Sequence, residues 1–272
     1  MTTNRGRAAR ATAPTTPTMA ATTPFRQIFW QTWRDLVFVH WAVDPAAVAR
    51  LLPPELEPET FEGKAYVALV PFLMTGIRFV GLPPIPGTSR TLETNVRTYV
   101  RRRGAAAEAI PAVWFWSLEA ESTLAVRAAR WGFGLPYCKA TMQYERATAN
   151  DAAGRALATR IARSERLWPQ PTPAHSLVDA TFAADAPFAA ARPGTLEHFL
   201  VERYALYAQR GRALLHAEVR HTPYRIRAGA LRAVDPGLVV AAGVPAEALA
   251  GPALVHEAQD VTVRIGAPRV VR

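Results

Sequence analysis

The stretch TLETNVRTYV, residues 91–100, alternates two kinds of side chain along its length. Its odd positions carry the polar groups Thr91, Glu93, Asn95, Arg97 and Tyr99, while leucine, threonine and valine occupy the even positions. Successive side chains of a β-strand point to opposite faces, so the stretch predicts one strand with a polar and a more apolar face. Two interpretations stay open. The polar face lines a cleft or barrel interior, or it is a salt-bridged surface face.

The polar face suggests a site for a small anion or a carbonyl compound. Arg97 supplies a guanidinium fork that fits a carboxylate, and Asn95 supplies a neutral donor. Glu93 is a proton shuttle if burial raises its pKa. The alternative is that Glu93 and Arg97 neutralise each other on one strand, because buried charges are usually paired whether or not they are functional.

Length and composition favour one large domain. The chain has 272 residues, half of them hydrophobic, which suffices for a sizeable core. Residues 1–24 are rich in Ala, Thr, Pro and Arg and predict a disordered tail, which leaves 25–272 as a single domain. The single cysteine, Cys138, fits a reducing cytoplasm. The apolar run 65–77 is broken by Pro71 and Gly76, so no membrane span is expected.

The net charge of +10 raises the question of nucleic-acid binding. Arg101–Arg103 is the one basic run outside the first residues, and the sequence has neither a basic helical stripe nor an aromatic RNA-binding signature. We therefore expect no specific nucleic-acid partner. His216 and His221 are five residues apart and face opposite sides of a strand, so no metal site is predicted, and no cofactor is expected. A homo-oligomer stays open.

About ten strands and three or four helices are expected, without regular alternation of strand and helix. This pattern predicts a mainly β (α+β) fold, an antiparallel sheet or barrel with a few peripheral helices. Residues 25–43 suggest a short helix followed by a strand. Residues 138–146 and 155–166 suggest a hairpin, and the clearest helix is expected from Leu196 to about Gln209.

Four further residues each have a functional and a structural interpretation. His40 lies in an apolar strand and is a general base or a satisfied core histidine. Lys139 is one of only two lysines, able to form a Schiff base or simply to reach water. Arg203 contacts a ligand or forms the ion-paired edge of its helix, and Cys138 is a nucleophile or a small buried side chain.

Three phrases, LETNVRTYV (92–100), GLPYCKATM (134–142) and LEHFLVERYALY (196–207), together with residues 39–78, resemble the bacterial YqjF-like family. That family is a domain of unknown function and is itself similar to acetoacetate decarboxylase. The resemblance covers about residues 30–265. It implies an acetoacetate decarboxylase-like antiparallel β-barrel around a ligand cavity, with the Glu93 strand facing the cavity.

The resemblance also weakens the expected chemistry. The decarboxylase places its Schiff-base lysine in a Gly-aromatic-Pro-Lys-Lys phrase, whereas here Tyr137 and Cys138 occupy the lysine positions. One hypothesis is a lyase-like enzyme in which Glu93 is the acid and base, Arg97 the anion clamp and Tyr137 the proton donor or oxyanion partner. The supporting ligand contacts would be Asn95, Tyr99, His40 and Arg203.

Whether the chain is an enzyme stays open at this point. The first alternative is a non-catalytic protein that holds a small anionic ligand in the same cavity. The second is a structural or partner-binding domain in which the polar strand is only a salt-bridged face.

Overall fold

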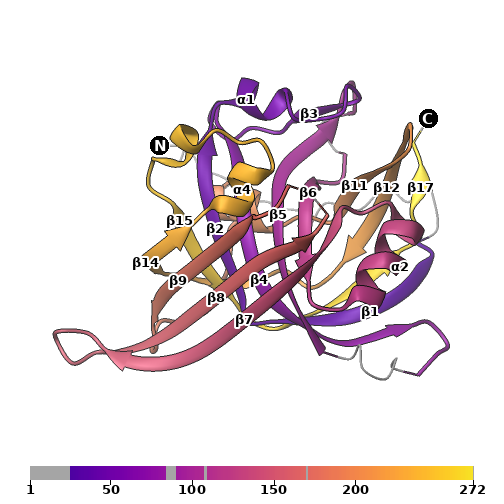
Figure 1. The fold of residues 1–272 in the computed structure, drawn as a ribbon. Helices are drawn as coiled ribbons and strands as arrows, with labels where there is room; N and C mark the ends of the chain where they lie inside the picture. Colours follow the sequence, from indigo (N-terminus) through magenta and orange to yellow (C-terminus); the bar gives the residue numbers. More distant parts are fainter. Residues whose placement is uncertain (1–24, 84–89, 107–108, 170, 272) are drawn as a thin grey trace, which may run out of the picture.

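The computed structural model describes residues 25–83, 90–106, 109–169 and 171–271 (Figure 1). The first strands are β1 (Gln27–Arg34), β2 (Leu36–Val43), β3 (Leu56–Pro58), β4 (Ala65–Phe79), β5 (Arg90–Arg102), β6 (Ala112–Ala120), β7 (Tyr137–Asn150), β8 (Ala156–Trp168) and β9 (His175–Ala183). They are followed by β10 (Ala189–Ala190), β11 (Ala205–Arg210), β12 (Ala213–Arg220), β13 (Arg225–Ala228), β14 (Ala230–Asp235), β15 (Leu254–Ala258), β16 (Val261–Gly266) and β17 (Arg269–Val270). The helices are α1 (Pro45–Ala49), α2 (Thr123–Phe133), α3 (Leu196–Val201), α4 (Gly237–Ala241) and the short 3₁₀ helix η1 (Ala246–Leu249).

Hydrogen-bonded strand pairs form a ring, here called the strand ring. The pairings run from β1 to β4, then to β5 and β6. Strand β6 pairs in parallel with β11, which continues through β12 and β16 back to β1. All pairs of the ring other than β6–β11 are antiparallel, so side chains from strands far apart in the sequence face one interior.

Strands β2, β4 and β5 separate two apolar cores. One core lies on the side of these strands that faces the strand-ring interior and includes Phe38, Val70 and Tyr99. The other lies on the opposite face of the same strands and includes Val67 and Val96, packed under β9 and α4. Because both faces of β5 are buried, the expected alternation within 91–100 separates two interiors rather than an interior from solvent.

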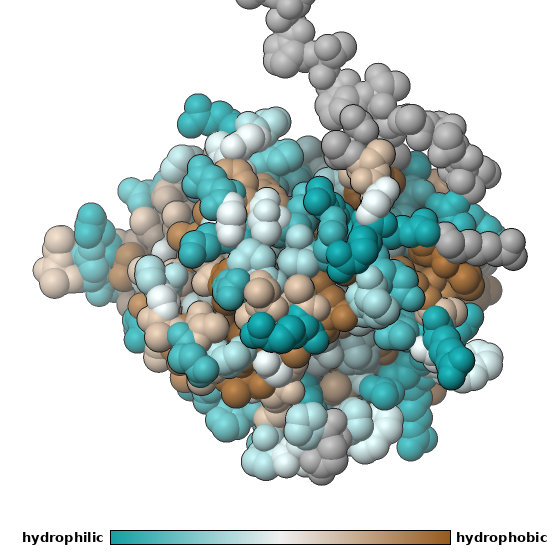
Figure 2. Space-filling model, turned by 90° about the horizontal axis from the view of Figure 1, so that it is seen from above, coloured by the Kyte–Doolittle hydropathy of each residue, from teal (hydrophilic) through white to brown (hydrophobic). Residues whose placement is uncertain are grey.

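The helices lie at the periphery. Helix α1 begins after Asp44, whose side chain accepts a hydrogen bond from the Ala46 amide, and Ser122 caps α2 in the same way. In Figure 1 the β7–β8 hairpin projects from the body of the molecule, and α2 lies at the opposite side. The face seen from above in Figure 2 is mostly hydrophilic, with hydrophobic residues visible between the polar ones.

The structure confirms a mainly β, mostly antiparallel fold with peripheral helices, but the helix expected from Leu196 to about Gln209 is wrong in its second half. Helix α3 ends at Val201, and the chain continues as strand β11. The Glu202 carboxylate accepts hydrogen bonds from the Tyr224 amide and the Tyr204 hydroxyl at this point. Strand β11 then pairs on both sides, and these ladder bonds outweigh the local helical pattern.

The short helix expected at the start of 25–43 is also wrong. The segment forms β1 and β2, separated by Asp35, which has a φ of 53°. Its aromatic residues are spaced for a strand, because Phe29 and Trp33 line the interior while Trp30 lies on the outer face. The predicted tail, 1–24, lies outside the described residues. Among the described residues, no helix has the length and apolar character needed to cross a bilayer.

Candidate ligand-binding site

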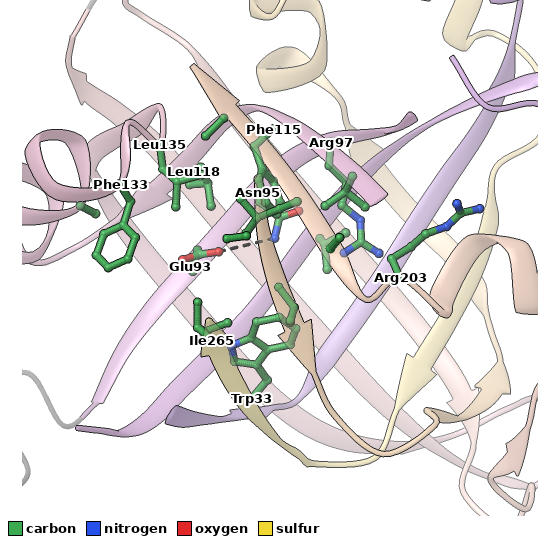
Figure 3. A pocket seen from close by; sticks show the side chains of 18 of the residues that line it. Trp33, Glu93, Asn95, Arg97, Phe115, Leu118, Phe133, Leu135, Arg203 and Ile265 are labelled. Atoms are coloured by element: carbon green, nitrogen blue, oxygen red, sulfur yellow. Dashed lines mark hydrogen bonds between the residues drawn. The ribbon is translucent and has the colours of Figure 1, made fainter. Parts of the chain in front are cut away.

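Strand β5 directs Glu93, Asn95 and Arg97 into a cavity inside the strand ring (Figure 3). The three residues are 3%, 4% and 6% exposed, so the polar face of the 91–100 stretch is an interior face. The cavity has a volume of about 130 Å³. Most of its remaining wall is apolar, contributed among others by Phe72, Val113, Phe115, Leu118, Phe133, Leu135 and Ile265.

Glu93 forms the centre of the polar wall. Its Oε2 accepts a 2.7 Å hydrogen bond from the Tyr137 hydroxyl, and its Oε1 lies 3.5 Å from Asn95 Nδ2. Burial raises the pKa of Glu93 from 4.5 to about 7, against the hydrogen bonds from Tyr137 and Asn95, which lower it. Burial and the neighbouring Glu93 raise the pKa of Tyr137 well above its usual value, so the phenol keeps its proton. A carboxyl group poised near neutrality therefore contacts a phenol donor.

Tyr137 reaches Glu93 because β7 runs parallel to β6. Leu118 of β6 lies opposite Tyr137 on one side and opposite Asn95 on the other. The preceding turn contains Gly134, whose φ of 65° ends α2 in the left-handed region. A Cβ at Gly134 would lie 3.0 Å from a backbone oxygen of β11. Both this close approach and the positive φ therefore favour glycine at this position.

Arg97 is a buried guanidinium without a carboxylate partner in the part of the chain that the structure describes. It forms none of the ion pairs found among the described residues, whereas Arg166 pairs with Glu119. Its Nε and Nη2 atoms are buried and have no hydrogen-bond partner in the described part of the chain. Its carbon Cζ lies 5.1 Å from the centre of the Phe38 ring. The expected neutralisation of Glu93 by Arg97 on one strand is therefore not observed, and Arg97 is left with donors for an anion.

Arg203 also lines the cavity, but its guanidinium has partners. It pairs with Glu59 and donates to the Phe199 carbonyl, with 2.7 Å from Nε to that oxygen. In Figure 3 its side chain extends away from Glu93. Burial lowers the pKa of Arg203, with the Glu59 carboxylate acting against this shift. Its position is that of a wall residue whose donors are satisfied.

His40 and Tyr99 do not line the cavity. His40 Nε2 lies 2.6 Å from the Tyr99 hydroxyl, and both residues are fully buried in the ring interior. Burial, followed by the nearby Arg97, lowers the pKa of His40 well below its usual value. The pair therefore packs beside Arg97 as neutral groups.

Cys138 and Lys139, unlike Tyr137, are not among the residues that line the cavity. The Cys138 thiol is buried, and its pKa is raised to about 11 by burial and by Glu119, which disfavours the nucleophilic thiolate. Lys139 is not among the residues that line the cavity, and its Nζ donates a 2.5 Å hydrogen bond to the Glu121 carbonyl. The described residues that line this cavity include no lysine.

Sequence reasoning missed two polar residues of the site, both on β1. Gln31 is 7% exposed and lines the cavity, as does Trp33, whose Nε1 atom is buried without a partner among the described residues. The alternation of residues 29, 31 and 33 with 30 and 32 would have indicated which side chains point inward. It was not applied because a helix was predicted for this segment. Within the described residues, His, Cys, Asp and Glu side chains form no group of three or more that could hold a metal ion.

The chain matches the DUF2071 family, described as "Uncharacterized conserved protein (COG2071)", over residues 30–262. It therefore belongs to this family. It is 35% identical over 200 residues to the uncharacterized protein YqjF of Bacillus subtilis (strain 168), covering 74% of this chain and 75% of that one. The expected YqjF-like membership is confirmed.

Two solved structures have a similar fold. An acetoacetate decarboxylase-like enzyme from Sphingomonas wittichii RW1 aligns with a TM-score of 0.55 at 15% identity, covering 96% of this chain and 99% of that one. The enduracididine biosynthesis enzyme MppR, in complex with pyruvate, aligns with a TM-score of 0.54 at 17% identity, covering 93% of each chain. At these identities the likeness establishes an acetoacetate decarboxylase-like fold and nothing further.

Proposed function

We propose that this protein binds a small organic acid that also carries a carbonyl group, and that Glu93 and Tyr137 move a proton to or from the bound molecule. The observation that carries the proposal is the shared cavity of an unpaired guanidinium, Arg97, and the hydrogen-bonded Glu93–Tyr137 pair. In this arrangement Arg97 holds the carboxylate of the ligand, because a buried guanidinium without a counter-ion gains most from an anion.

The Glu93–Tyr137 pair has the properties of an acid–base catalyst. A carboxyl group with a pKa of about 7 exchanges its proton readily near neutral pH. In a lyase reaction of a 3-oxo acid, the C–C bond to the carboxylate breaks, its electron pair moves into the 3-carbonyl group as an enolate, and CO₂ leaves. The Tyr137 hydroxyl stabilises the negative charge on the enolate oxygen. Protonated Glu93 then donates its proton to the enolate carbon that lost CO₂, and Glu93 is left as a carboxylate.

This chemistry would proceed without a Schiff base. No lysine is among the described residues of the cavity wall, and Tyr137 and Cys138 stand where a decarboxylase phrase carries lysines. One structural neighbour is described in complex with pyruvate, a small oxo acid, which supports the same ligand class here. The missing lysine also favours a second candidate, a binding protein that holds such an acid without converting it.

The proposal extends to the architecture. We take the strand ring to act as a closed barrel around the ligand and residues 25–272 to act as one domain. A cytoplasmic location and a homo-oligomer complete the proposal as expectations. No specific nucleic-acid partner and no cofactor are needed for the chemistry described.

The experiment incubates the full chain in D₂O with 2-oxo and 3-oxo acids and follows CO₂ release and deuterium incorporation by NMR. Calorimetry measures binding of the same acids. The variants are Glu93→Gln and Arg97→Met, with Glu145→Gln at an exposed position as the control.

If the protein is an enzyme, the Glu93→Gln variant should bind the acid without turning it over. The Arg97→Met variant should no longer bind the acid. A protein that binds the acids but never turns them over is the non-catalytic alternative. If no acid of the panel binds to the wild-type protein, the proposed cavity function is wrong.

A further inference from the structure

Strand β1 contributes its own polar wall to the cavity. Its inward residues are Phe29, Gln31 and Trp33, and its outward residues include Trp30 and Thr32, which line a groove on the other face. In Figure 3 Trp33 lies below Glu93 and Asn95, on the opposite side of the cavity from Phe115. The β1 wall therefore faces the cavity from a different direction than the polar wall of β5.

Neither polar group of this wall has a hydrogen-bond partner among the described residues. Gln31 is 7% exposed as a residue, and its side chain makes no hydrogen bond to another described residue. The indole N–H of Trp33 is buried and has no acceptor within the described chain. Buried polar groups in folded proteins are nearly always hydrogen-bonded, because an unpaired one carries the full cost of desolvation. The Trp33 indole N–H is such a group, and the Gln31 amide lies on the same strand face at the cavity wall. Together they indicate that a bound molecule supplies their partners.

The charges of the lining residues restrict what that partner is. The ionisable carboxylate and guanidinium groups around the cavity are Glu93, Arg97 and Arg203, and none of them belongs to β1. An amide and an indole N–H are neutral donors, which suit a neutral acceptor oxygen better than a second carboxylate.

The register separates the two walls along the cavity. Trp33 lies opposite Met74 of β4, and Met74 lies opposite Thr91 of β5. Arg97 lies further along β5, beyond Glu93 and Asn95. A ligand whose carboxylate contacts Arg97 therefore presents a different part of its length to Gln31 and Trp33.

We propose that Gln31 and Trp33 form a subsite for an uncharged oxygen of the ligand, so that the protein selects monocarboxylic acids that carry a ketone or hydroxyl group away from the carboxylate. The inference rests on the proposed carboxylate site at Arg97 and adds the residues that distinguish such acids from plain fatty acids and from dicarboxylates. Cavity size limits the length. A dry cavity of about 150 Å³ accommodates benzene, so a cavity of about 130 Å³ admits short-chain acids.

The experiment compares matched acids by calorimetry on the full chain. The probes are butanoate, pentanoate and hexanoate, each paired with its oxo counterpart, 2-oxobutanoate, 4-oxopentanoate and 5-oxohexanoate, and pentanedioate serves as the dicarboxylate. We expect 4-oxopentanoate or 5-oxohexanoate to bind about three- to tenfold more tightly than its plain counterpart, as one added hydrogen bond allows. 2-Oxobutanoate, whose ketone adjoins the carboxylate, should show no such preference. Pentanedioate should bind more weakly than 4-oxopentanoate.

In each of the variants Gln31→Leu and Trp33→Phe, the ratio of the affinity for the oxo acid to that for its plain counterpart should fall toward one. Trp30→Phe is the matched control, because Trp30 lies on the same strand, has an equally unpaired indole N–H and lines the outer groove. It should keep the wild-type preference. Circular dichroism and thermal melting establish that each variant is folded.

Three outcomes separate the two proposals. If no acid binds, the carboxylate site itself is wrong. If acids bind and depend on Arg97 but neither 4-oxopentanoate nor 5-oxohexanoate is preferred over its counterpart, the β1 subsite is wrong while the proposed function stands. The same conclusion follows if the preference survives in both Gln31→Leu and Trp33→Phe.

Discussion

The Tyr137 hydroxyl donates a 2.7 Å hydrogen bond to Glu93 although their strands, β7 and β5, are not paired with each other. Strand β6 lies between them, antiparallel to β5 and parallel to β7. The contact therefore crosses a full strand inside the cavity. It places a phenol that keeps its proton against a carboxyl group that titrates near neutrality. This relationship accounts for the first two predictions.

Replacing Tyr137 with phenylalanine should raise the pKa of Glu93 further above 7. The hydrogen bond from Tyr137 favours the carboxylate form, so its loss leaves burial less opposed. An NMR titration of the Glu93 carboxyl carbon in wild type and Tyr137→Phe measures the shift. The variant should also lose about 1 kcal/mol of unfolding free energy, as for one net hydrogen bond. An unchanged or lower pKa would contradict the contact.

Replacing Glu93 with glutamine should stabilise the protein above pH 7 and have little effect near pH 4. The pKa of Glu93 is raised in the folded state, so the folded protein holds a proton that the unfolded chain releases between about pH 4.5 and 7. Stability is therefore lost as pH rises through this window. The difference between Glu93→Gln and wild type should grow by up to about 3 kcal/mol, at 1.36 kcal/mol per pKa unit.

Urea unfolding at pH 4.5, 6 and 8 measures this difference. Glu145→Gln, at an exposed salt-bridged position, is the control and should show no comparable growth. A Glu93→Gln benefit that is equal at all three pH values would show that folding does not raise the pKa of Glu93.

Replacing a buried arginine with methionine should change the free energy of unfolding differently at Arg166 and at Arg97. Arg166→Met should cost about 3–5 kcal/mol, because it leaves Glu119 buried and uncompensated. Arg97→Met removes a buried charge that has no ion pair in the described chain. The free energy of unfolding of this variant should therefore lie within about 1 kcal/mol of the wild-type value or exceed it. Equilibrium unfolding at pH 7 compares the two. A loss at Arg97 as large as that at Arg166 would reveal a counter-charge for Arg97 within the protein.

Lys139 should form no Schiff base with oxo acids. Its ammonium group donates to the Glu121 carbonyl and the residue does not line the cavity. Incubation with pyruvate and cyanoborohydride, followed by peptide mass analysis, should recover Lys139 without an adduct. Lys64 serves as an internal comparison, as the other lysine of the chain. A stoichiometric adduct at Lys139 alone would restore the lysine mechanism.

Several features were accessible from local sequence. The period-two pattern of 91–100 correctly predicted one strand with Glu93, Asn95 and Arg97 on a common face. The hairpin of β7 and β8 was equally local and was also predicted. The helix expected from Leu196 to about Gln209 went wrong because the Ala205–Arg210 segment gains ladder partners on both sides, and these come from distant parts of the chain.

The sequence by itself determined which residues share a face, because side-chain alternation along a strand depends only on backbone geometry. Only the tertiary structure decided what each face meets. It left Arg97 without a counter-ion among the described residues, brought Tyr137 across β6 to Glu93, and set Gln31 and Trp33 of β1 into the same cavity. These relations depend on pairings such as β1 with β16, between residues more than two hundred positions apart, whose register no local pattern specifies.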